Sequence, residues 1–206
     1  RLLCAEAGLS ESVFWNKSFQ ASELTRLTGA VAAFKKAKIF IDPTGGITIA
    51  ELRAKARRLK LKENIDVIVI DYLQLMHADG RVDSRQQEVA EISGGIKKLA
   101  KDLKVPVLVL AQLNREVDKT AGAGARPKLA HLRESGTIEQ DADIVTFLHR
   151  NREDAKEVSS PNQSVEAEWI IEKNRNGRTG NLKLLFFPSR MEFIPAAPYS
   201  EEDCPK

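Results

Sequence analysis

The chain has 206 residues with 32 basic and 29 acidic side chains, and its formal net charge is +3. Its 42% hydrophobic residues suffice for the core of one domain, and so small a net charge gives no argument by itself for nucleic acid. Cys4 and Cys204 lie near opposite ends without metal-ligand spacing, which indicates neither a disulfide framework nor a zinc site. Because the two cysteines indicate no disulfide framework, we expect a protein of the reducing cytoplasm. No apolar run approaches the roughly 20 residues of a membrane helix.

The first part of the chain predicts helices followed by a short strand. Residues 1–38 are expected to be helical, because apolar residues recur at steps of three and four between Leu24 and Phe34. The chain begins with arginine rather than methionine, and its first residues resemble the middle of a helix. We therefore expect that an N-terminal portion precedes it. Residues 39–42, three apolar residues and an aspartate, predict a short strand, because turn residues follow them.

Thr48 and Glu51 have the spacing of a capping box, in which each side chain satisfies a free backbone donor of the other residue. This signal predicts a helix over residues 49–61. The basic residues of that helix fall opposite its apolar face: Arg53, Lys55, Arg57, Arg58, Lys60 and Lys62. We interpret them as a solvated face rather than a nucleic-acid contact.

A second helix is predicted from Ser84, which with Gln87 offers another capping box, to Leu103. Its apolar residues alternate steps of three and four, which is typical of a helix with one buried stripe. Gly94 and Gly95 interrupt it, and each costs about 1 kcal/mol relative to alanine. Nothing in the sequence explains this pair.

Two apolar runs end at polar residues. The run from Val67 to Ile70 ends at Asp71, and the run over 105–111 ends at Gln112. Such runs are typical of strands buried in a parallel sheet, and with the helix between them they predict a βαβ unit with a right-handed crossover. Asp71 and Gln112 are therefore expected on one edge of the sheet, where α/β folds bind ligands.

The two strand ends carry groups that a nucleotide site uses. The carboxylate of Asp71 can hold Mg²⁺, usually through water, and the amide of Gln112 can sense a γ-phosphate or orient water. Each residue also has an ordinary interpretation, because acids at strand ends cap turns and amides anchor loops. Together they favour a nucleotide site more than either does alone.

Late strands are expected at 143–148, 166–172 and 182–187, and a basic turn joins the last two. Arginine matches phosphate geometry bidentately, so Arg175 in this turn can serve as an arginine finger that reaches a neighbouring subunit's nucleotide. Lys173 lies beside it. The ordinary interpretation is a solvated hairpin turn, because the turn also contains Asn-Gly, a strong hairpin signal. The hairpin turn and the arginine finger can both be correct.

A dense polar block surrounds Gly136. Arg133, the backbone amides near Gly136 and small hydroxyls are suited to gripping a phosphate backbone without reading bases. Composition alone also fits a capped surface helix. Nearby acids, Glu134 among them, argue against DNA unless they orient the arginine, so both interpretations stay open from the residues.

Several blocks together resemble the C-terminal motor domain of DnaB-type replicative helicases. They are 67–76, 84–88, 111–115, 132–143 and 173–180. The similarity runs in order over residues 1–194. It implies an α/β fold, a RecA-like mostly parallel sheet flanked by helices and incomplete at its N-terminal side. Residues 195–206 have little periodicity and are expected to form a loose tail.

The resemblance also implies roles for single residues. Asp71 would be the Walker B aspartate that holds Mg²⁺ through water, and Gln112 the γ-phosphate sensor. Arg175 would be the finger acting on the adjacent subunit's nucleotide, with Lys173 contacting the same phosphate. Asp71, Gln112, Lys173 and Arg175 would thus form the catalytic and ATP-binding set.

For nucleic acid, the resemblance assigns Arg133, Glu134 and Gly136 to the loop that grips DNA in a central channel. The segments 77–85 and 114–128 correspond to other channel-facing loops. The implied protein is a homohexamer that hydrolyses ATP with Mg²⁺, translocates on single-stranded DNA and unwinds duplex at the replication fork. A primase and a helicase loader are its expected partners.

The chain departs from the family's pattern in three ways. His131 stands where the family usually has an acid, Gly94 and Gly95 replace better helix formers, and no phosphate loop or catalytic glutamate occurs. We therefore expect little ATP hydrolysis from these residues alone. The alternative is a catalytically inactive RecA-like ring partner or DNA-binding module without its own phosphate loop. A RecA-like recombinase would share the strand ends but not the 132–143 block.

Overall fold

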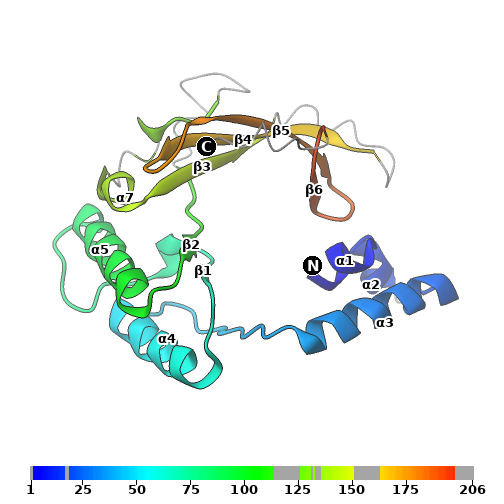
Figure 1. Cartoon of the computed structure of the whole chain (residues 1–206), viewed down its shortest axis with the longest axis horizontal. Coiled ribbons are helices and arrows are strands. Elements are labelled where there is room, and N and C mark those ends of the chain that lie inside the picture. The colour runs from blue at the N-terminus through cyan, green and yellow to red at the C-terminus, as the bar shows by residue number, and fades with distance from the viewer. Residues whose placement is uncertain are drawn as a thin grey trace. The chain divides into compact units, whose positions relative to one another are not determined.

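The computed structural model describes residues 2–16, 19–113, 126–130, 132, 136–150 and 163–197. The chain divides into two compact units (Figure 1). Unit 1 comprises Arg1–Ile39, Asp118–Pro127 and Thr146–Lys206. Unit 2 comprises Phe40–Val117 and Lys128–Val145.

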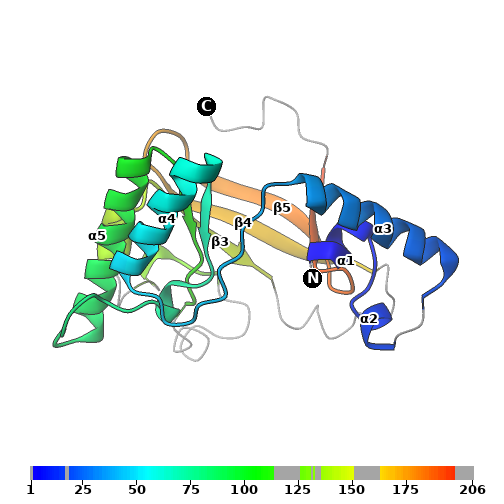
Figure 2. The same cartoon turned by 90° about the horizontal axis from the view of Figure 1, so that it is seen from below.

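Unit 2 is built on the predicted parallel strand pair. Its elements are α4 (Ile49–Glu63), β1 (Ile68–Ile70), the 3-10 helix η1 (Leu73–Leu75), α5 (Arg85–Leu103), β2 (Val107–Val109) and α7 (Gly136–Asp141). β1 and β2 pair in parallel, with Ile68 opposite Val107 and Ile70 opposite Val109. α5 connects them, and α4 lies beside α5 (Figures 1 and 2). The predicted βαβ unit is therefore confirmed.

Both long helices of unit 2 begin at the predicted caps. At α4, Thr48 Oγ1 accepts a hydrogen bond from Glu51 N (3.3 Å) and Thr48 N donates to Glu51 Oε2 (3.0 Å), so this capping box is complete. At α5, Ser84 Oγ accepts from Gln87 N (3.2 Å). The Gln87 side chain accepts from Asp83 N (3.2 Å) instead of Ser84 N, so only half of the second predicted box forms.

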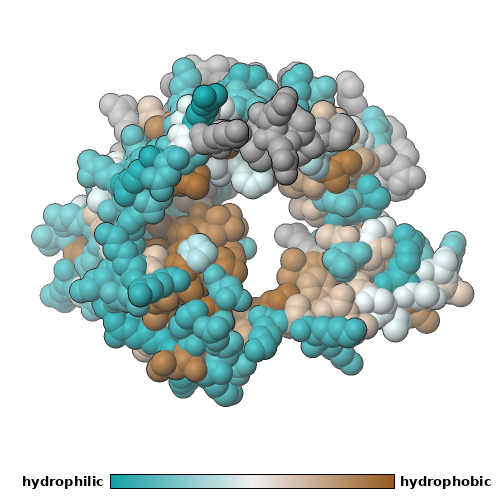
Figure 3. Space-filling view, in the orientation of Figure 1, coloured by the Kyte–Doolittle hydropathy of each residue, from teal (hydrophilic) through white to brown (hydrophobic). Residues whose placement is uncertain are grey.

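The core of unit 2 lies against one face of the parallel pair. Its buried members are Ile49, Ile70, Leu73, Met76, Val89, Ile92 and Ile96. The opposite face of the two strands is exposed, with Val69 at 58% and Leu108 at 56% of full exposure. Hydrophobic surface gathers at the place of β1 and β2 in the space-filling view (Figure 3). The described residues therefore cover only one face of this sheet.

Gly94 and Gly95 have different surroundings on α5. A methyl group at Gly95 would overlap the Ile49 side chain at the start of α4, whereas a methyl group at Gly94 would meet nothing within 4 Å. Gly94 is also exposed. Close packing of α4 on α5 thus explains Gly95, and nothing in the structure explains Gly94.

Unit 1 contains the three helices α1 (Leu2–Ala7), α2 (Ser12–Asn16) and α3 (Ala21–Lys36), so the predicted helical character of residues 1–38 is confirmed. α1 packs against α3 through a small core with Ala7, Leu9 and Ala30. In the described part of the chain no helix is both long enough and apolar enough to cross a membrane.

The short strand predicted at residues 39–42 does not form. Ile39 is 50% exposed and Ile41 78% exposed. A strand exists only when its backbone donors and acceptors find a neighbouring strand, and no described segment pairs with these residues. The prediction was wrong because the apolar pattern of residues 39–42 says nothing about whether a neighbouring strand is available to pair with them.

A four-stranded sheet in the order β3-β4-β5-β6 completes the described fold. Its strands are β3 (Ile144–His149), β4 (Val165–Asn174), β5 (Gly180–Phe187) and β6 (Glu192–Pro195). β4 and β5 form the predicted antiparallel hairpin, and β6, which was not predicted, pairs antiparallel with β5. Where the domain ends and a tail begins stays a prediction, because residues 198–206 lie outside the described residues.

The two glycines of α5 give a matched pair of stability variants. Gly95→Ala should lower the free energy of unfolding by about 1–3 kcal/mol, because the added methyl overpacks against Ile49. Gly94→Ala should raise it by about 0.5–1 kcal/mol, because alanine restricts the unfolded chain and favours helix. Urea denaturation followed by circular dichroism measures both. A stabilising Gly95→Ala would contradict the close contact between α4 and α5.

Candidate functional site

Asp71 follows the last residue of β1 directly and is exposed to solvent. Its peptide bond with Tyr72 is cis. On both sides of Asp71 the backbone is tied to the neighbouring strand segment: Leu110 N donates to Ile70 O (2.9 Å), and Leu73 N donates to Leu110 O (2.9 Å). Asp71 is therefore an exposed carboxylate on a well-anchored strand end.

Gln112 lies beyond the end of β2 on the same edge of the parallel pair and is also exposed. The Gln74 side chain holds its backbone: Gln112 N donates to Gln74 Oε1 (3.1 Å), and Gln74 Nε2 donates to Gln112 O (2.9 Å). The predicted placement of Asp71 and Gln112 at one sheet edge is thus confirmed. Their chemical roles stay predictions.

A polar network connects this edge to the segment after η1. Arg85 Nη2 donates to Gln74 O (3.0 Å), and its guanidinium also pairs with Glu88. The Glu88 carboxylate accepts from Ala78 N (3.3 Å) and lies 3.4 Å from His77 Nδ1. The hydrogen bond from Arg85 is the largest cause that holds the pKa of Glu88 below its usual range, with burial opposing it.

Gln74 lies within one of the blocks that resemble the family, but no role was predicted for it. The residue stands between Leu73 and Leu75 in an otherwise apolar 3-10 turn. Leu73 is 2% exposed. One amide in an apolar turn is a usable signal, because a partly buried polar group needs hydrogen-bond partners.

The single carboxylate at this edge fits a Mg²⁺ ion that is bound together with a nucleotide better than a metal ion bound entirely by protein side chains. Among the described residues there is no group of three or more His, Cys, Asp or Glu side chains that could hold a metal ion. Mg²⁺ commonly keeps several waters and takes one or two carboxylates together with substrate phosphates. Asp71 alone on an exposed edge matches that requirement.

Lys173 and Arg175 belong to unit 1, at the turn of the β4–β5 hairpin. Lys173 lies in β4, and Arg175 follows the strand in the exposed turn. The Asn174 side chain closes this turn, with Nδ2 donating to Arg178 O (3.3 Å). A Cβ at Gly177 would lie 2.5 Å from Asn174 Nδ2. The turn therefore depends on both Asn174 and Gly177, which fixes the backbone that carries Arg175.

Of the predicted DNA-gripping residues, Arg133 and Glu134 lie outside the described residues, as do residues 114–125 of a further predicted channel segment. Gly136 is described: it is exposed and begins α7. The segment 77–84 is described in full and leads into α5.

α7, which begins at the predicted DNA-gripping residue Gly136, is anchored to α5. The buried hydroxyl of Ser93 donates to Asp141 Oδ2 (2.7 Å), and Lys97 pairs with Asp143. The residues C-terminal to Gly136 are thus held to α5, the same helix that connects β1 and β2.

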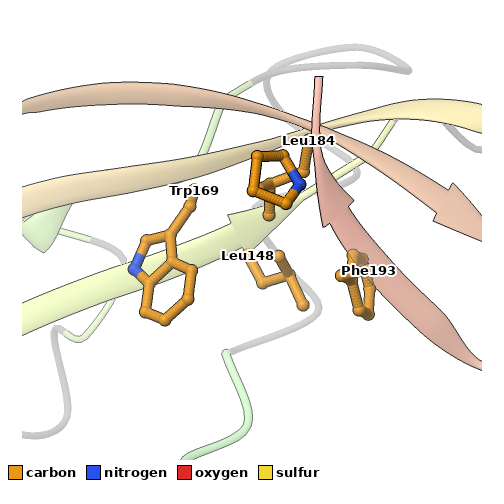
Figure 4. A pocket seen from close by; sticks show the side chains of 5 residues that line it. Leu148, Trp169, Leu184 and Phe193 are labelled. Atoms are coloured by element: carbon orange, nitrogen blue, oxygen red, sulfur yellow. The ribbon is translucent and has the colours of Figure 1, made fainter. Parts of the chain in front are cut away.

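Two other surface features are separate from the polar candidates. The predicted solvated face of α4 is confirmed for Arg57, Arg58 and Lys62, which are exposed, whereas Arg53, Lys55 and Lys60 are partly buried. Arg57 pairs with Asp102 (3.0 Å) and Lys55 with Asp42 (2.7 Å). On unit 1, a shallow apolar hollow of about 260 Å³ lies on the four-stranded sheet (Figure 4). Its lining is apolar: Leu148, Trp169, Leu184, Phe193 and Pro195. The side chains that line the hollow offer no acid–base group for catalysis.

The sequence that forms these strand ends matches a known protein family. A family model described as the DnaB-like helicase C terminal domain matches residues 1–195. The chain belongs to this DnaB-like helicase family. The DnaB-like match covers all of unit 2, unit 1 up to residue 195, and every candidate catalytic and DNA-binding residue named above.

Relatives agree with the DnaB-like assignment. The chain is 42% identical over 195 residues to the replicative DNA helicase DnaC of Bacillus subtilis, covering 94% of this chain and 42% of that protein. The same figures hold for the replicative DNA helicase DnaB of Geobacillus stearothermophilus. The chain therefore spans less than half the length of these curated relatives.

Solved structures give the fold. One of them, an ATPase domain, superposes with a TM-score of 0.84 at 32% identity, over 95% of this chain and 69% of that chain. A DnaB-like replicative helicase, whose interactions with primase were studied together with its structure, has a TM-score of 0.83 at 32% identity, over 94% and 47% of the two chains. The predicted RecA-like α/β fold is confirmed, with parallel pairing in β1–β2 and antiparallel pairing in the β4–β6 meander.

The Arg85–Glu88 pair predicts a pH effect in this DnaB-like chain. Arg85→Met should raise the pKa of Glu88, because the hydrogen bond that lowers it most is lost. A carboxylate with a lowered folded pKa stabilises the fold above its unfolded pKa, and this contribution disappears as the pH falls through the folded pKa. Parent and variant should therefore differ in thermal stability at neutral pH and converge in acid.

Carbon-detected NMR titration of Glu88 and thermal denaturation across pH measure the effect. Arg58→Met, on the exposed side of α4, is the matched control and should leave the Glu88 titration unchanged. An unchanged Glu88 titration in Arg85→Met would refute the assignment of this pair as the main cause of the shift.

Proposed function

We propose that this chain is the motor domain of a hexameric, ATP-dependent replicative DNA helicase that translocates on single-stranded DNA and unwinds duplex at the replication fork. The observation that carries the proposal is the parallel pairing of β1 and β2, which brings Asp71 and Gln112 to one sheet edge in a DnaB-like chain. Open α/β sheets bind their ligands beyond the carboxyl ends of their strands.

At that edge Asp71 holds a water of the magnesium ion, and the Gln112 amide contacts the γ-phosphate or the attacking water. Bound Mg²⁺ neutralises charge that develops on the phosphates during transfer. An amide suits the second position because it donates and accepts hydrogen bonds without adding charge. Both side chains are exposed, as a site that admits a nucleotide from solvent requires.

Arg175 acts as the finger on the nucleotide of the adjacent subunit, with Lys173 beside it. The exposed turn that carries Arg175 is closed by Asn174 and Gly177, so its backbone is held before any partner arrives. A preorganised cation supplied from a neighbour stabilises transition-state charge without large rearrangement. This role requires a neighbouring subunit, and we propose that the subunits form a homohexamer.

Arg133, Glu134 and Gly136 contact single-stranded DNA in the channel of that ring. The anchoring of α7 to α5 through Ser93 and Asp141 supports a firmly held base for this loop. One similar solved structure is that of a DnaB-like replicative helicase with interactions with primase. We propose a primase and a helicase loader as partners of the full-length protein, and the cytoplasm as its location.

The nucleotide role of Asp71 is tested in the full-length protein by Asp71→Asn. The neutral amide cannot hold the magnesium water as a carboxylate does, so the turnover number for DNA-stimulated ATP hydrolysis should fall at least about 100-fold. Steady-state ATPase assays with and without single-stranded DNA measure it, and circular dichroism confirms folding. Normal turnover in Asp71→Asn would overturn the assignment, and a parent without turnover would favour an inactive ring partner.

The finger role of Arg175 is tested by complementation. Arg175→Ala alone should lose about 10³-fold or more of its ATPase activity. When Arg175→Ala and Asp71→Asn subunits are co-expressed, some interfaces join an intact Asp71 to an intact Arg175. Part of the activity should then return in the mixed rings. Mixed rings as inactive as either parent variant would show that Arg175 does not act across the interface.

The DNA role of Arg133 predicts a change that does not depend on sequence. Arg133→Ala should weaken binding of different single-stranded oligonucleotides equally and reduce the slope of log K against log salt by about 0.7, the value for one lost phosphate contact. Fluorescence anisotropy at several salt concentrations measures this slope. Arg58→Ala on α4 is the control, and an unchanged slope in Arg133→Ala would contradict the assignment.

A further inference from the structure

The hydrogen-bond ladder between β1 and β2 continues beyond the point where β1 leaves the sheet. After the last strand pair, Leu110 N donates to Ile70 O (2.9 Å) and Leu110 O accepts from Leu73 N (2.9 Å). The backbone then turns into η1. Opposite Gln112, the Gln74 side chain therefore replaces the backbone as hydrogen-bond partner. It accepts from Gln112 N and donates to Gln112 O.

A glutamine amide can do this because it has the same donor and acceptor as a peptide group. In a parallel ladder, alternate residues of one strand give both their N–H and their C=O to the neighbouring strand. Leu110 and Gln112 are such alternate residues. Gln74 therefore acts as the next peptide of the ladder although its own backbone has left the sheet.

The position of Gln74 is itself fixed on three sides. Leu73 and Met76, within two residues of it, are 2% and 1% exposed in the core of unit 2. Its carbonyl oxygen accepts from Arg85 Nη2 (3.0 Å), and Arg85 is in turn paired with Glu88. The amide that meets Gln112 thus projects from an anchored turn rather than from a free loop.

We propose that Gln74 is a positioning residue for Gln112. It keeps the Gln112 backbone extended in register with β1, so that the Gln112 side chain is presented at the edge that carries Asp71. The inference rests on the proposed function, in which Gln112 contacts the γ-phosphate or the attacking water. Gln74 itself touches neither the nucleotide nor the reacting atoms.

Loss of the Gln74 amide should affect the rate of hydrolysis rather than nucleotide binding. Gln112 would still be present, but among the described residues the segment that carries it would keep its hydrogen bonds to β1 and η1 only up to Leu110. Small displacements of a catalytic group reduce turnover strongly, whereas nucleotide affinity comes from the whole phosphate cradle. The expected signature is therefore a lower kcat with a nearly unchanged KM for ATP.

The test uses Gln74→Met, which keeps the length of the side chain and removes the amide, in the full-length protein. The kcat for DNA-stimulated ATP hydrolysis should fall about tenfold or more, and KM should stay within about twofold. Gln86→Met, at an exposed position on α5, is the matched control and should keep the parent's kcat. Hydrogen exchange should accelerate over residues 110–113 in Gln74→Met and not over β1.

A double-variant cycle separates positioning from an independent effect. Gln112→Ala should lower kcat, and Gln74→Met added to Gln112→Ala should lower it no further, because no side chain remains to be positioned. Multiplicative losses would overturn the proposal, as would an unchanged kcat in Gln74→Met while Gln112→Ala is impaired. An unchanged kcat in Gln112→Ala would instead refute the role proposed for Gln112, and the positioning role with it.

If Gln74→Met does not fold or assemble, Gln74→Glu carries the same test. It keeps the acceptor for Gln112 N and the length of the side chain, but loses the donor to Gln112 O. A reduced kcat with unchanged KM supports positioning. A Gln74→Glu protein with the parent's kcat and hydrogen exchange overturns it.

Discussion

The parallel pairing of β1 and β2 is the constraint on which the rest of unit 2 depends. Parallel neighbours cannot be joined by a tight turn, so a long connection must return across a face of the sheet. Here α5 makes that return, and two of its residues, Ile92 and Leu99, are fully buried. The packing that buries α5 is therefore also what places the ends of β1 and β2, with Asp71 and Gln112, on one edge.

The same pair of strands is apolar on both faces, although the described residues cover only one. Ile70 points into the core, while Val69 and Leu108 are more than half exposed. Alternation of buried and polar residues would be expected for strands with one solvated face. Apolar residues on both faces are typical of parallel strands that are covered on both sides.

Features set by nearby residues could be predicted from the sequence, and features that need distant partners could not. The capping box of Thr48 and Glu51 involves residues three apart, and α4 begins where that box predicts. The strand predicted at 39–42 failed because an extended segment needs a neighbour that the pattern does not name. Gly95 had no explanation in the sequence for the same reason, since its neighbour Ile49 belongs to another helix.

The candidate site also has features that could be predicted from the sequence and features that could not. Apolar runs that end at Asp71 and Gln112 were enough to predict one shared edge, because the rule for parallel strands is general. The hairpin of Arg175 was also predicted, but from Asn-Gly as a tight turn. In the structure Asn174, the last residue of β4 and two residues before Asn176, closes a longer connection to β5. The backbone that presents Arg175 could not be derived from the dipeptide alone.

Gln74 shows how these constraints meet at one residue. A carboxylate at the end of β1 is open to a ligand only if the chain turns away directly after it, and η1 begins two residues beyond Asp71. That departure removes the backbone partner of Gln112 on the neighbouring segment. An apolar residue at position 74 would leave the peptide of Gln112 without its ladder bonds, whereas a glutamine restores both with its side chain. An open edge next to Asp71 and a held Gln112 backbone therefore require a polar residue inside an apolar turn.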